Sequence, residues 1–358
     1  MKGYTLLGVL MLLVSTVDSQ YMFTLPPKSG FQSGMCYIED GTYYRLFANR
    51  VKKETYIEAY NLQTGKLRDS HIITGLSDAQ AFYKVSDNEF WLFDVSKAAF
   101  VFAKDGKIVK RIPSFGNNEP ESGYYHYFID MAHNPIHYYR SKIYAVNALY
   151  RVAGVEIKHT KSNEFIYETD EKSLIHTKVP IPATLFSKDF GMLNRFTSLR
   201  RDNVIVIAPI YSNEIMLYNM DNGNVVFPVI DKNNSYYSVT KPLFEGDKFY
   251  TDQLTQKLLD NRMNEHYESA DMYVSIHYDP YRKVYYRALR RRKPENKNET
   301  NLTIVVLDER FRFLKSQELD KKYLHYGMFV SEKGLNIFNH QEYMKNNNSL
   351  TFDTFLLW

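Results

Sequence analysis

The sequence predicts an all-β fold, specifically a six-bladed β-propeller, and three observations support this. Short β-rich runs recur in pairs joined by polar turns, several with Asn-Gly or Asp-Gly. These dipeptides tolerate positive φ and make the tight hairpin turns that fit twisted strands. The chain has 30 Tyr and 23 Phe against 16 Gly, and aromatic side chains pack well on pleated strands. The unit repeats along the chain, which is typical of a radial array of small sheets.

Six repeating units can be drawn. Blades of four strands usually need ~40–50 residues. The units are expected at about residues 35–75, 79–115, 127–182, 195–229, 272–319 and 326–358. A β-sandwich also has short strands at regular spacing, but six four-stranded units in a row are hard to fit into one sandwich. We therefore expect residues 20–358 to form a single propeller domain. Within the insert at residues 232–270, only residues 251–263 have helical character.

The last unit is one strand short. We expect residues 21–25 to supply its missing outer strand, because this pairing closes the ring and removes an exposed sheet edge. Cys36 is the only cysteine, so no internal disulfide can form and stability has to come from the core and from ring closure. Cys36 itself is expected to be a small buried hydrophobic residue.

The N-terminus has the pattern of a cleaved secretory signal. Lys2 is followed by an apolar run over residues 6–17, and small side chains occupy the positions before a cleavage site after Ser19. The run is shorter than the ~20 residues that span a membrane, and no second segment approaches that length. Residues 1–19 are thus predicted to be a signal peptide, and the protein to be exported to the periplasm, the cell envelope or the medium, without a transmembrane segment.

The charge pattern does not favour nucleic-acid binding. The net charge is +4, and the one basic cluster is Arg-Arg-Arg-Lys at residues 290–293. It precedes the polar residues 294–299 and is interpreted as a solvated hairpin tip. A nucleic-acid interface would instead have a broad basic face.

Two motifs with ligand-like spacing are interpreted as turns. His133 and His137 have the spacing of a helical zinc pair, but Pro135 between them favours a turn. Residues 219–224 look like the start of a calcium loop but lack its bidentate Glu, and predict a hairpin turn. The sequence predicts no metal site, no cofactor and no catalytic residue, and a monomer is favoured.

One segment also carries a family resemblance. Residues 277–287, His-Tyr-Asp-Pro-Tyr-Arg-Lys-Val-Tyr-Tyr-Arg, together with six irregular units and a secretory signal, resemble a family of exported bacterial six-bladed propeller proteins. That family is similar in form to TolB-like and NHL-like propellers and is a domain of unknown function. The resemblance covers nearly the whole mature chain and implies the fold and export, but no activity. Many members look like lipoproteins, whereas this chain lacks a lipid-accepting cysteine after the apolar run.

The candidate ligand site follows from the topology. Connections from the outer strand of one blade to the inner strand of the next lie on one face, beside the axis, and would bring polar and aromatic side chains together there. The predicted ligand-binding residues are Tyr125, His126, Arg195, His266, His325 and Tyr326. Arg195 favours an anionic group, and the three histidines predict binding that depends on pH between about pH 5 and 8. Alternatively, each residue caps its own blade.

The sequence thus predicts a secreted or envelope-associated binding or interaction module. Its partner would be a small molecule, a glycan or a protein at the propeller face. The alternative function is a propeller-type enzyme, a lyase or lactonase, that holds a metal near the axis with Glu, Asp, Asn or His side chains.

Overall fold

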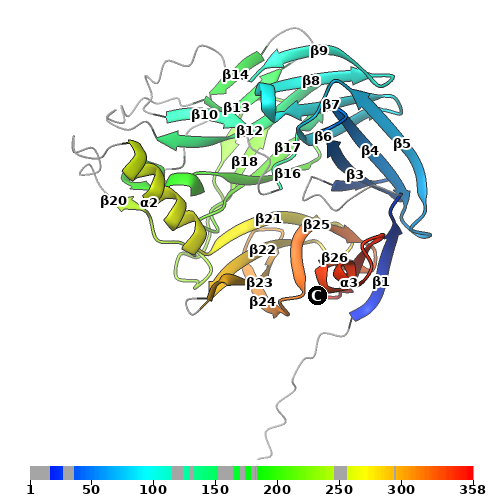
Figure 1. Ribbon diagram of the computed structural model, residues 1–358. Helices are drawn as coiled ribbons and strands as arrows, with labels where there is room; N and C mark the ends of the chain where they lie inside the picture. The colour runs from blue at the N-terminus through cyan, green and yellow to red at the C-terminus, as the bar shows by residue number, and fades with distance from the viewer. Residues whose placement is uncertain are drawn as a thin grey trace, which may run out of the picture.

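The computed structural model describes residues 17–26, 36–114, 124–128, 133–151, 164–169, 174–178, 182, 184–245, 256–293 and 296–357. Most of the predicted signal peptide, residues 1–16, lies outside this range. The strands form small antiparallel sheets around a common centre, as Figure 1 shows. Five of these sheets are four-stranded blades.

The first two blades are meanders of four consecutive strands. They consist of β2 (Cys36–Glu39), β3 (Thr42–Asn49), β4 (Glu54–Asn61) and β5 (Leu67–Thr74), and of β6 (Ala79–Ser86), β7 (Glu89–Asp94), β8 (Ala99–Lys104) and β9 (Lys107–Pro113). The short helix η1 (Val95–Lys97) joins β7 to β8. Middle strands such as β7 are buried along nearly their whole length, because blades pack on both faces, whereas the outer strands β5 and β9 are largely exposed.

Two further meanders follow later in the chain. They consist of β16 (Phe196–Arg201), β17 (Val204–Pro209), β18 (Met216–Asn219) and β19 (Val225–Val226), and of β21 (Met272–Asp279), β22 (Val284–Lys293), β23 (Asn296–Asp308) and β24 (Phe313–Leu319). The predicted hairpin turns are confirmed. Gly65, Gly106 and Gly223 all have positive φ at the turns between paired strands, and residues 219–224 form such a turn.

The fifth blade joins the two ends of the chain. It contains β25 (Tyr323–Ser331), β26 (Gly334–Asn339), β27 (Ser349–Phe355) and, at its outer edge, β1 (Val17–Thr24), with the helix α3 (His340–Lys345) between β26 and β27. β1 lies beside this C-terminal sheet in Figure 1. The prediction that an N-terminal strand completes the last blade is therefore confirmed.

Aromatic side chains pack together where β1 closes the ring. Phe23 of β1 is fully buried, and its ring stacks on Tyr43 with a centroid separation of 4.5 Å and an interplanar angle of 9°. Phe329 and Phe352 pack against the same ring. Cys36 is buried in this cluster, as the sequence predicted. The core therefore binds the first blade to the last without a disulfide.

The remaining sheet of the ring is five-stranded. It consists of β10 (Tyr124–Phe128), β11 (His137–Tyr139), β12 (Lys142–Arg151), β13 (Glu164–Thr169) and β14 (Leu174–Lys178). β12 pairs with β10 through one half and with β11 through the other. Contacts of β2 with β25, β3 with β6, β6 with β11, β12 with β16, β16 with β21 and β21 with β25 close the circle. The molecule is thus a β-propeller.

The predicted number of blades requires a correction. Among the described residues, five blades are four-stranded rather than six. The unit expected at 127–182 departs from the pattern because its innermost strand is interrupted. β10 ends at Phe128, the described residues 133–136 lie outside the strands, and β11 begins at His137. Both strands pair with the same long strand β12.

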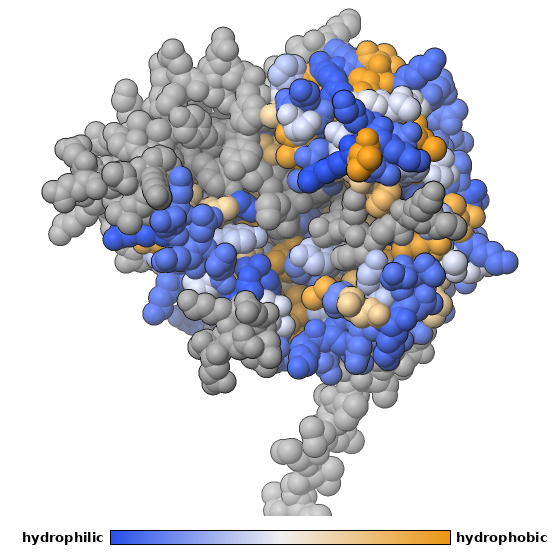
Figure 2. Space-filling model, in the orientation of Figure 1, coloured by the Kyte–Doolittle hydropathy of each residue, from blue (hydrophilic) through white to orange (hydrophobic). Residues whose placement is uncertain are grey.

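Short elements cover one side of the ring. They are α1 (Thr184–Ser187), β15 (Lys188–Asp189), η2 (Gly191–Leu193), β20 (Phe244–Glu245) and α2 (Gln256–Ser269). α2 overlaps the predicted helical stretch 251–263 from residue 256 and continues to Ser269, while residues 251–255 lie outside the described part. No helix in the described part of the chain is both long and apolar enough to cross a membrane. On the face seen in this orientation, most of the described surface is hydrophilic, with smaller apolar areas (Figure 2).

Candidate functional site

The innermost strands of a propeller run in the same direction, so their starts share one face beside the axis. Arg195 directly precedes β16, and His325 and Tyr326 lie near the start of β25. α2 ends at Ser269, shortly before β21 begins. Tyr125 and His126 lie in β10, opposite Tyr150 and Leu149 of β12, but their side chains are outside the described part.

Four side chains form what we call the arginine–tyrosine cluster: Arg195, Tyr267, Arg290 and Tyr326. The ring of Tyr267 lies 5.4 Å from the guanidinium carbon of Arg195 and 5.3 Å from that of Arg290. Arg290 Nη2 also donates a hydrogen bond to the carbonyl oxygen of Tyr267 at 3.2 Å. Burial raises the pKa of Tyr326, whereas the nearby charge of Arg290 acts in the opposite direction. The cluster thus combines two cations with two aromatic rings.

Arg290 is the most informative member of this cluster. Its side chain is largely removed from water, and this burial lowers its pKa. Its Nε–H has no hydrogen-bond partner in the described part of the chain. No carboxylate among the described residues forms an ion pair with Arg290. Within the described part of the chain, Arg290 is thus a desolvated cation without an acidic partner, an arrangement that is costly unless another group compensates the charge.

This arrangement corrects the prediction that residues 290–293 form a solvated tip. β22 continues to Lys293 and pairs with β23. Arg290, Arg291 and Arg292 are therefore held in a sheet and are only partly exposed. Arg291 lies over the ring of Tyr236 at 5.4 Å, on the other side of the strand from Arg290. Residues 294–295 lie outside the described part.

A group of three histidines, the axial histidine cluster, lies next to the arginine–tyrosine cluster. It consists of His133, His277 of β21 and His325 of β25. The ring of His133 lies edge-on to His277 at 5.4 Å and to His325 at 6.5 Å. His325 in turn lies 4.1 Å from the ring of Tyr326. The two clusters are therefore in direct contact.

His133 reaches across the centre of the ring. Its Nε2 lies 2.9 Å from the carbonyl oxygen of His325, and its own carbonyl oxygen accepts a hydrogen bond from Ser198 N of β16 at 3.2 Å. Two blades separate β25 from the five-stranded sheet in either direction around the ring. His133 has φ +49°, which is uncommon for a residue other than glycine. The interrupted inner strand thus places an imidazole on the axis.

The axial histidines are neutral at physiological pH. Burial lowers the pKa of His277 and of His325 to about 3, and it also lowers the pKa of His133. The prediction that His325 makes binding pH-dependent between pH 5 and 8 is therefore wrong, because its proton is lost well below that window. The sequence alone does not show that His325 is buried, so the lowered pKa could not be predicted from it.

His266 does not point into the clusters. Its Nε2 lies 2.8 Å from the carbonyl oxygen of Lys241. Of the six predicted site residues, the structure links Arg195, His325 and Tyr326 through Tyr267 and Arg290. It leaves the His266 side chain in a local contact with the segment before β20.

Residues 133–136 are irregular and lead into β11 at His137, so the two histidines are not on a helix. Asn134 Nδ2 donates to the carbonyl oxygen of Val146 at 2.5 Å, and Ser198 Oγ donates to Asn134 Oδ1 at 2.7 Å. His137 Nε2 lies 2.9 Å from Ser198 Oγ. This buried network attaches the five-stranded sheet to β16. Among the described residues, no group of three or more His, Cys, Asp or Glu is placed to hold a metal ion.

Comparison with known proteins assigns the family. The DUF4221 domain, a domain of unknown function, matches residues 16–318. The chain belongs to the DUF4221 family. A solved DUF4221 member from Bacteroides vulgatus ATCC 8482 is 15% identical, and the alignment covers 95% of this chain and 97% of that one with a TM-score of 0.69. A candidate exported protein from Bacteroides fragilis NCTC 9343 is 9% identical, with coverages of 93% and 94% and a TM-score of 0.48. No curated protein matches the sequence.

The comparisons support the propeller fold and assign the family. At 15% identity, the B. vulgatus structure shows the propeller fold of this DUF4221 protein and does not identify a ligand. The predicted likeness to TolB-like and NHL-like propellers stays a prediction.

The sequence analysis missed Arg290, Tyr267, His133 and His277 as site residues. A signal for Arg290 was present, because the β-rich run from Val284 continues through Leu289 without a breaker. This continuity argues for a strand that extends into the basic residues. No comparable signal marks His133, whose position depends on an interruption of the inner strand.

Proposed function

We propose that this DUF4221 protein is an exported binding module whose axial face binds a small molecule or glycan that carries an anionic group. The observation that carries this proposal is the desolvated guanidinium of Arg290, which has no acidic partner among the described residues. A carboxylate, sulfate or phosphate group would supply the missing negative charge. Guanidinium groups bind such oxyanions with two parallel hydrogen bonds.

Arg195 strengthens this preference for an anion. Its guanidinium lies over the same Tyr267 ring as that of Arg290, so two positive groups are held within reach of one site. Both groups lie on β-sheet elements or directly beside them, which fixes their positions better than a long loop would. The expected ligand is therefore held chiefly through its charged group.

Aromatic rings would hold the rest of the ligand. Tyr326 contacts His325, and Tyr267 contacts both arginines. Flat, partly apolar faces of this kind stack on sugar rings and on aromatic ligands. The neutral histidines of the axial histidine cluster, which contacts Tyr326 through His325, offer hydrogen bonds without adding charge.

The cellular location and the ring count are part of the same proposal. The N-terminal apolar run and the small residues before Gln20 support export through a cleaved signal.

The five-stranded sheet occupies one position of the closed ring, and we count it as an irregular sixth blade. On this count, the sixth blade differs from the others in its innermost strand, which is divided into β10 and β11.

Thermal-shift measurements with matched ligand pairs test the function. Each pair contains a neutral compound and its acidic form, such as glucose with glucuronate and with glucose 6-phosphate, or a neutral with an acidic tripeptide. The acidic member of at least one pair should raise the melting temperature, and its neutral partner should not. Equal stabilisation by both members of every active pair, or stabilisation by the neutral members only, would contradict the proposal.

A further inference from the structure

A separate cavity lies beside the outer part of the β16–β19 blade. Its volume is about 510 Å³, which is within the range typical of small-molecule sites. Its walls are mostly apolar and are formed by Pro182, Pro209, Ile215, Met216, Phe227, Pro228, Val229 and Ile230. Glu214, Lys232 and Tyr237 are the polar residues of the lining.

The carboxylate of Glu214 is the central polar group of this cavity. Its Oε1 accepts hydrogen bonds from Thr184 Oγ1 at 2.7 Å and from Tyr237 Oη at 2.9 Å, and Oε2 lies 3.3 Å from Ser212 Oγ. All three donors are neutral hydroxyl groups. No Lys or Arg among the described residues forms an ion pair with Glu214. Among the described residues, the carboxylate of Glu214 is thus held by hydroxyl groups and forms no ion pair.

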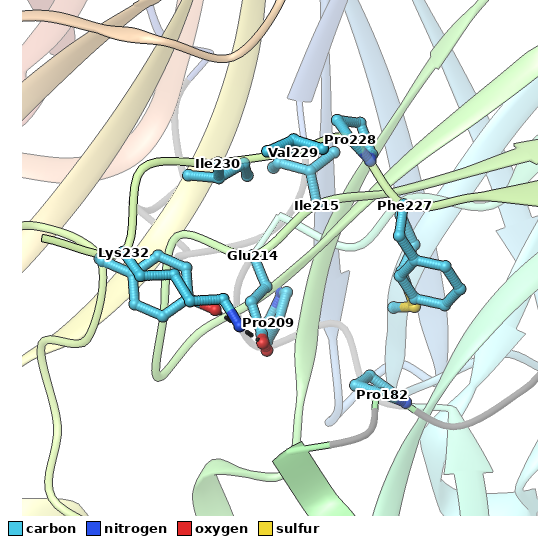
Figure 3. A pocket seen from close by; sticks show the side chains of 11 residues that line it. Pro182, Pro209, Glu214, Ile215, Phe227, Pro228, Val229, Ile230 and Lys232 are labelled. Carbon is cyan, nitrogen blue, oxygen red and sulfur yellow. Dashed lines mark hydrogen bonds between the residues drawn. The ribbon is translucent and has the colours of Figure 1, made fainter. Parts of the chain in front are cut away.

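Lys232 does not act as that cation. Its Nζ lies 5.9 Å from the centre of the Tyr237 ring and is not paired with Glu214. Figure 3 shows Lys232 and Glu214 on one side of the cavity, with Phe227 and Pro182 on the opposite side. Phe227 and Val229 are 49% and 93% exposed, so the apolar wall continues to the surface. A ligand can therefore enter from solvent past these two residues.

A buried arginine from the neighbouring blade fixes the loop that carries Glu214. Arg287 is fully buried and donates hydrogen bonds to the carbonyl oxygens of Pro209 and Ser212, each at 2.8 Å, and to Asn213 Oδ1 at 3.0 Å. The loop is therefore anchored at three points directly before Glu214. This anchoring keeps the carboxylate in a defined place, as a binding site requires.

We propose that this cavity binds a small organic cation, an ammonium group on an apolar body, with the ammonium at Glu214 and the body against Phe227, Met216 and Ile215. The carboxylate would repel an anion, and a wholly apolar ligand would leave its charge unpaired in a poorly hydrated space. An ammonium group satisfies the charge and the free acceptor capacity of Oε2 together. The nearby rings of Phe227 and Tyr237 also favour a cation.

The charges of Lys232 and Glu214 should have opposite effects on the binding of an ammonium compound. A bound ammonium would be repelled by Lys232 and attracted by Glu214. Removing the lysine charge should therefore leave binding intact or strengthen it, whereas removing the glutamate charge should weaken it. A purely structural role of either residue predicts no such opposite pair of effects.

Isothermal titration of the full chain with three compounds of similar shape tests the site. The probes are phenethylamine, 2-phenylethanol and 3-phenylpropanoate at pH 7. The amine should bind at least about tenfold more tightly than the alcohol or the acid. In Glu214→Gln, amine binding should fall to the level of the alcohol, while alcohol binding and the melting temperature stay unchanged. Lys232→Met should bind the amine as well as or better than the unmodified chain.

Two further variants keep the test decisive. Phe227→Ala shortens an exposed part of the wall and should weaken all bound probes alike. Arg290→Gln should leave amine binding unchanged, which separates this cavity from the axial face. The proposal is overturned if no probe binds at 10 mM, if the alcohol binds as tightly as the amine, or if Glu214→Gln retains full amine binding.

Discussion

Tyr267 contacts Arg290 in two ways: its carbonyl oxygen accepts a hydrogen bond from Nη2 at 3.2 Å, and its ring centre lies 5.3 Å from the guanidinium carbon. The end of helix α2 and strand β22 are thereby joined beside the axis. The contact orients the guanidinium but does not neutralise it, because neither group of Tyr267 carries a negative charge. No carboxylate among the described residues pairs with Arg290, and under the proposed function its charge would bind the anionic group of the ligand.

Ring closure by β1 should contribute strongly to stability. Phe23→Ala removes a fully buried ring that stacks on Tyr43 and should lower the free energy of unfolding by about 3–5 kcal/mol. Met22→Ala, on the same strand but 52% exposed, is the matched control and should change it little. Urea unfolding of the two variants measures the difference. Equal stabilities would contradict closure through this core.

Cleavage after Ser19 should remove the first three residues of β1 and leave residues 20–24 as the outer strand. Gln20 Nε2 donates to Asp353 Oδ1 at 2.8 Å, and residues 20–24 pair with β27 in continuous register. The mature protein is therefore expected to begin at Gln20 and to keep the closing strand. Mass spectrometry of the protein secreted by a bacterial host determines this terminus. A mature chain that starts after residue 25 would lack the strand and would refute the account of closure.

Arg287 should stabilise the contact between two blades. Burial lowers its pKa to about 10, still far above neutral, so the group stays charged and donates to three oxygens of the β17–β18 connection. Arg287→Met relieves the cost of burying a charge but leaves these acceptors unpaired, at about 1–3 kcal/mol each. We expect a net loss of about 1–3 kcal/mol. Arg291→Met is the control, and a more stable Arg287→Met variant would be the contrary result.

The protein should lose stability in mild acid. Burial lowers the pKa of His137, His277 and His325 to about 3 in the folded state, against about 6.5 when unfolded. Between these values the unfolded chain binds more protons, so stability falls as pH falls below about 6.5. Each histidine contributes a slope of about 1.4 kcal/mol per pH unit.

Urea unfolding at pH 7, 6 and 5 measures this slope. His277→Phe keeps a ring in the axial histidine cluster and removes one titrating group. The slope of its unfolding free energy against pH should therefore be smaller by about 1.4 kcal/mol per pH unit. A free energy of unfolding that stays constant or rises from pH 7 to pH 5 would show that these histidines are not buried as neutral groups.

Much of the fold was predictable because it depends on local chemistry. Turns at Gly65, Gly106 and Gly223 need positive φ, and the strands around them need apolar and aromatic residues. The strand that closes the ring was also predictable, since the last unit lacked one and the N-terminal run was free to supply it. The interrupted strand before His137 was not predictable, because nothing local distinguishes it from a continuous one.

The candidate site was predicted less completely. Topology placed Arg195, His325 and Tyr326 near the axis, since it depends only on which strand is innermost. It did not reveal that Arg290 and His133 reach the same region, because their positions depend on the length of β22 and on the contact of His133 with His325 of a distant blade. Burial, which sets the pKa of His325, is likewise a property of the assembled ring.

The central claim is that the axial face binds an anion through Arg290. The most direct test is isothermal titration of the unmodified chain, Arg290→Gln and Arg291→Gln with the acidic compound that gives the largest thermal shift. A charge-assisted hydrogen bond contributes about 1.5–3 kcal/mol, so Arg290→Gln should bind roughly 10- to 100-fold more weakly, while Arg291→Gln, whose side chain lies over Tyr236, should bind like the unmodified chain. Unchanged affinity in Arg290→Gln, or equal losses in the two variants, would contradict the account.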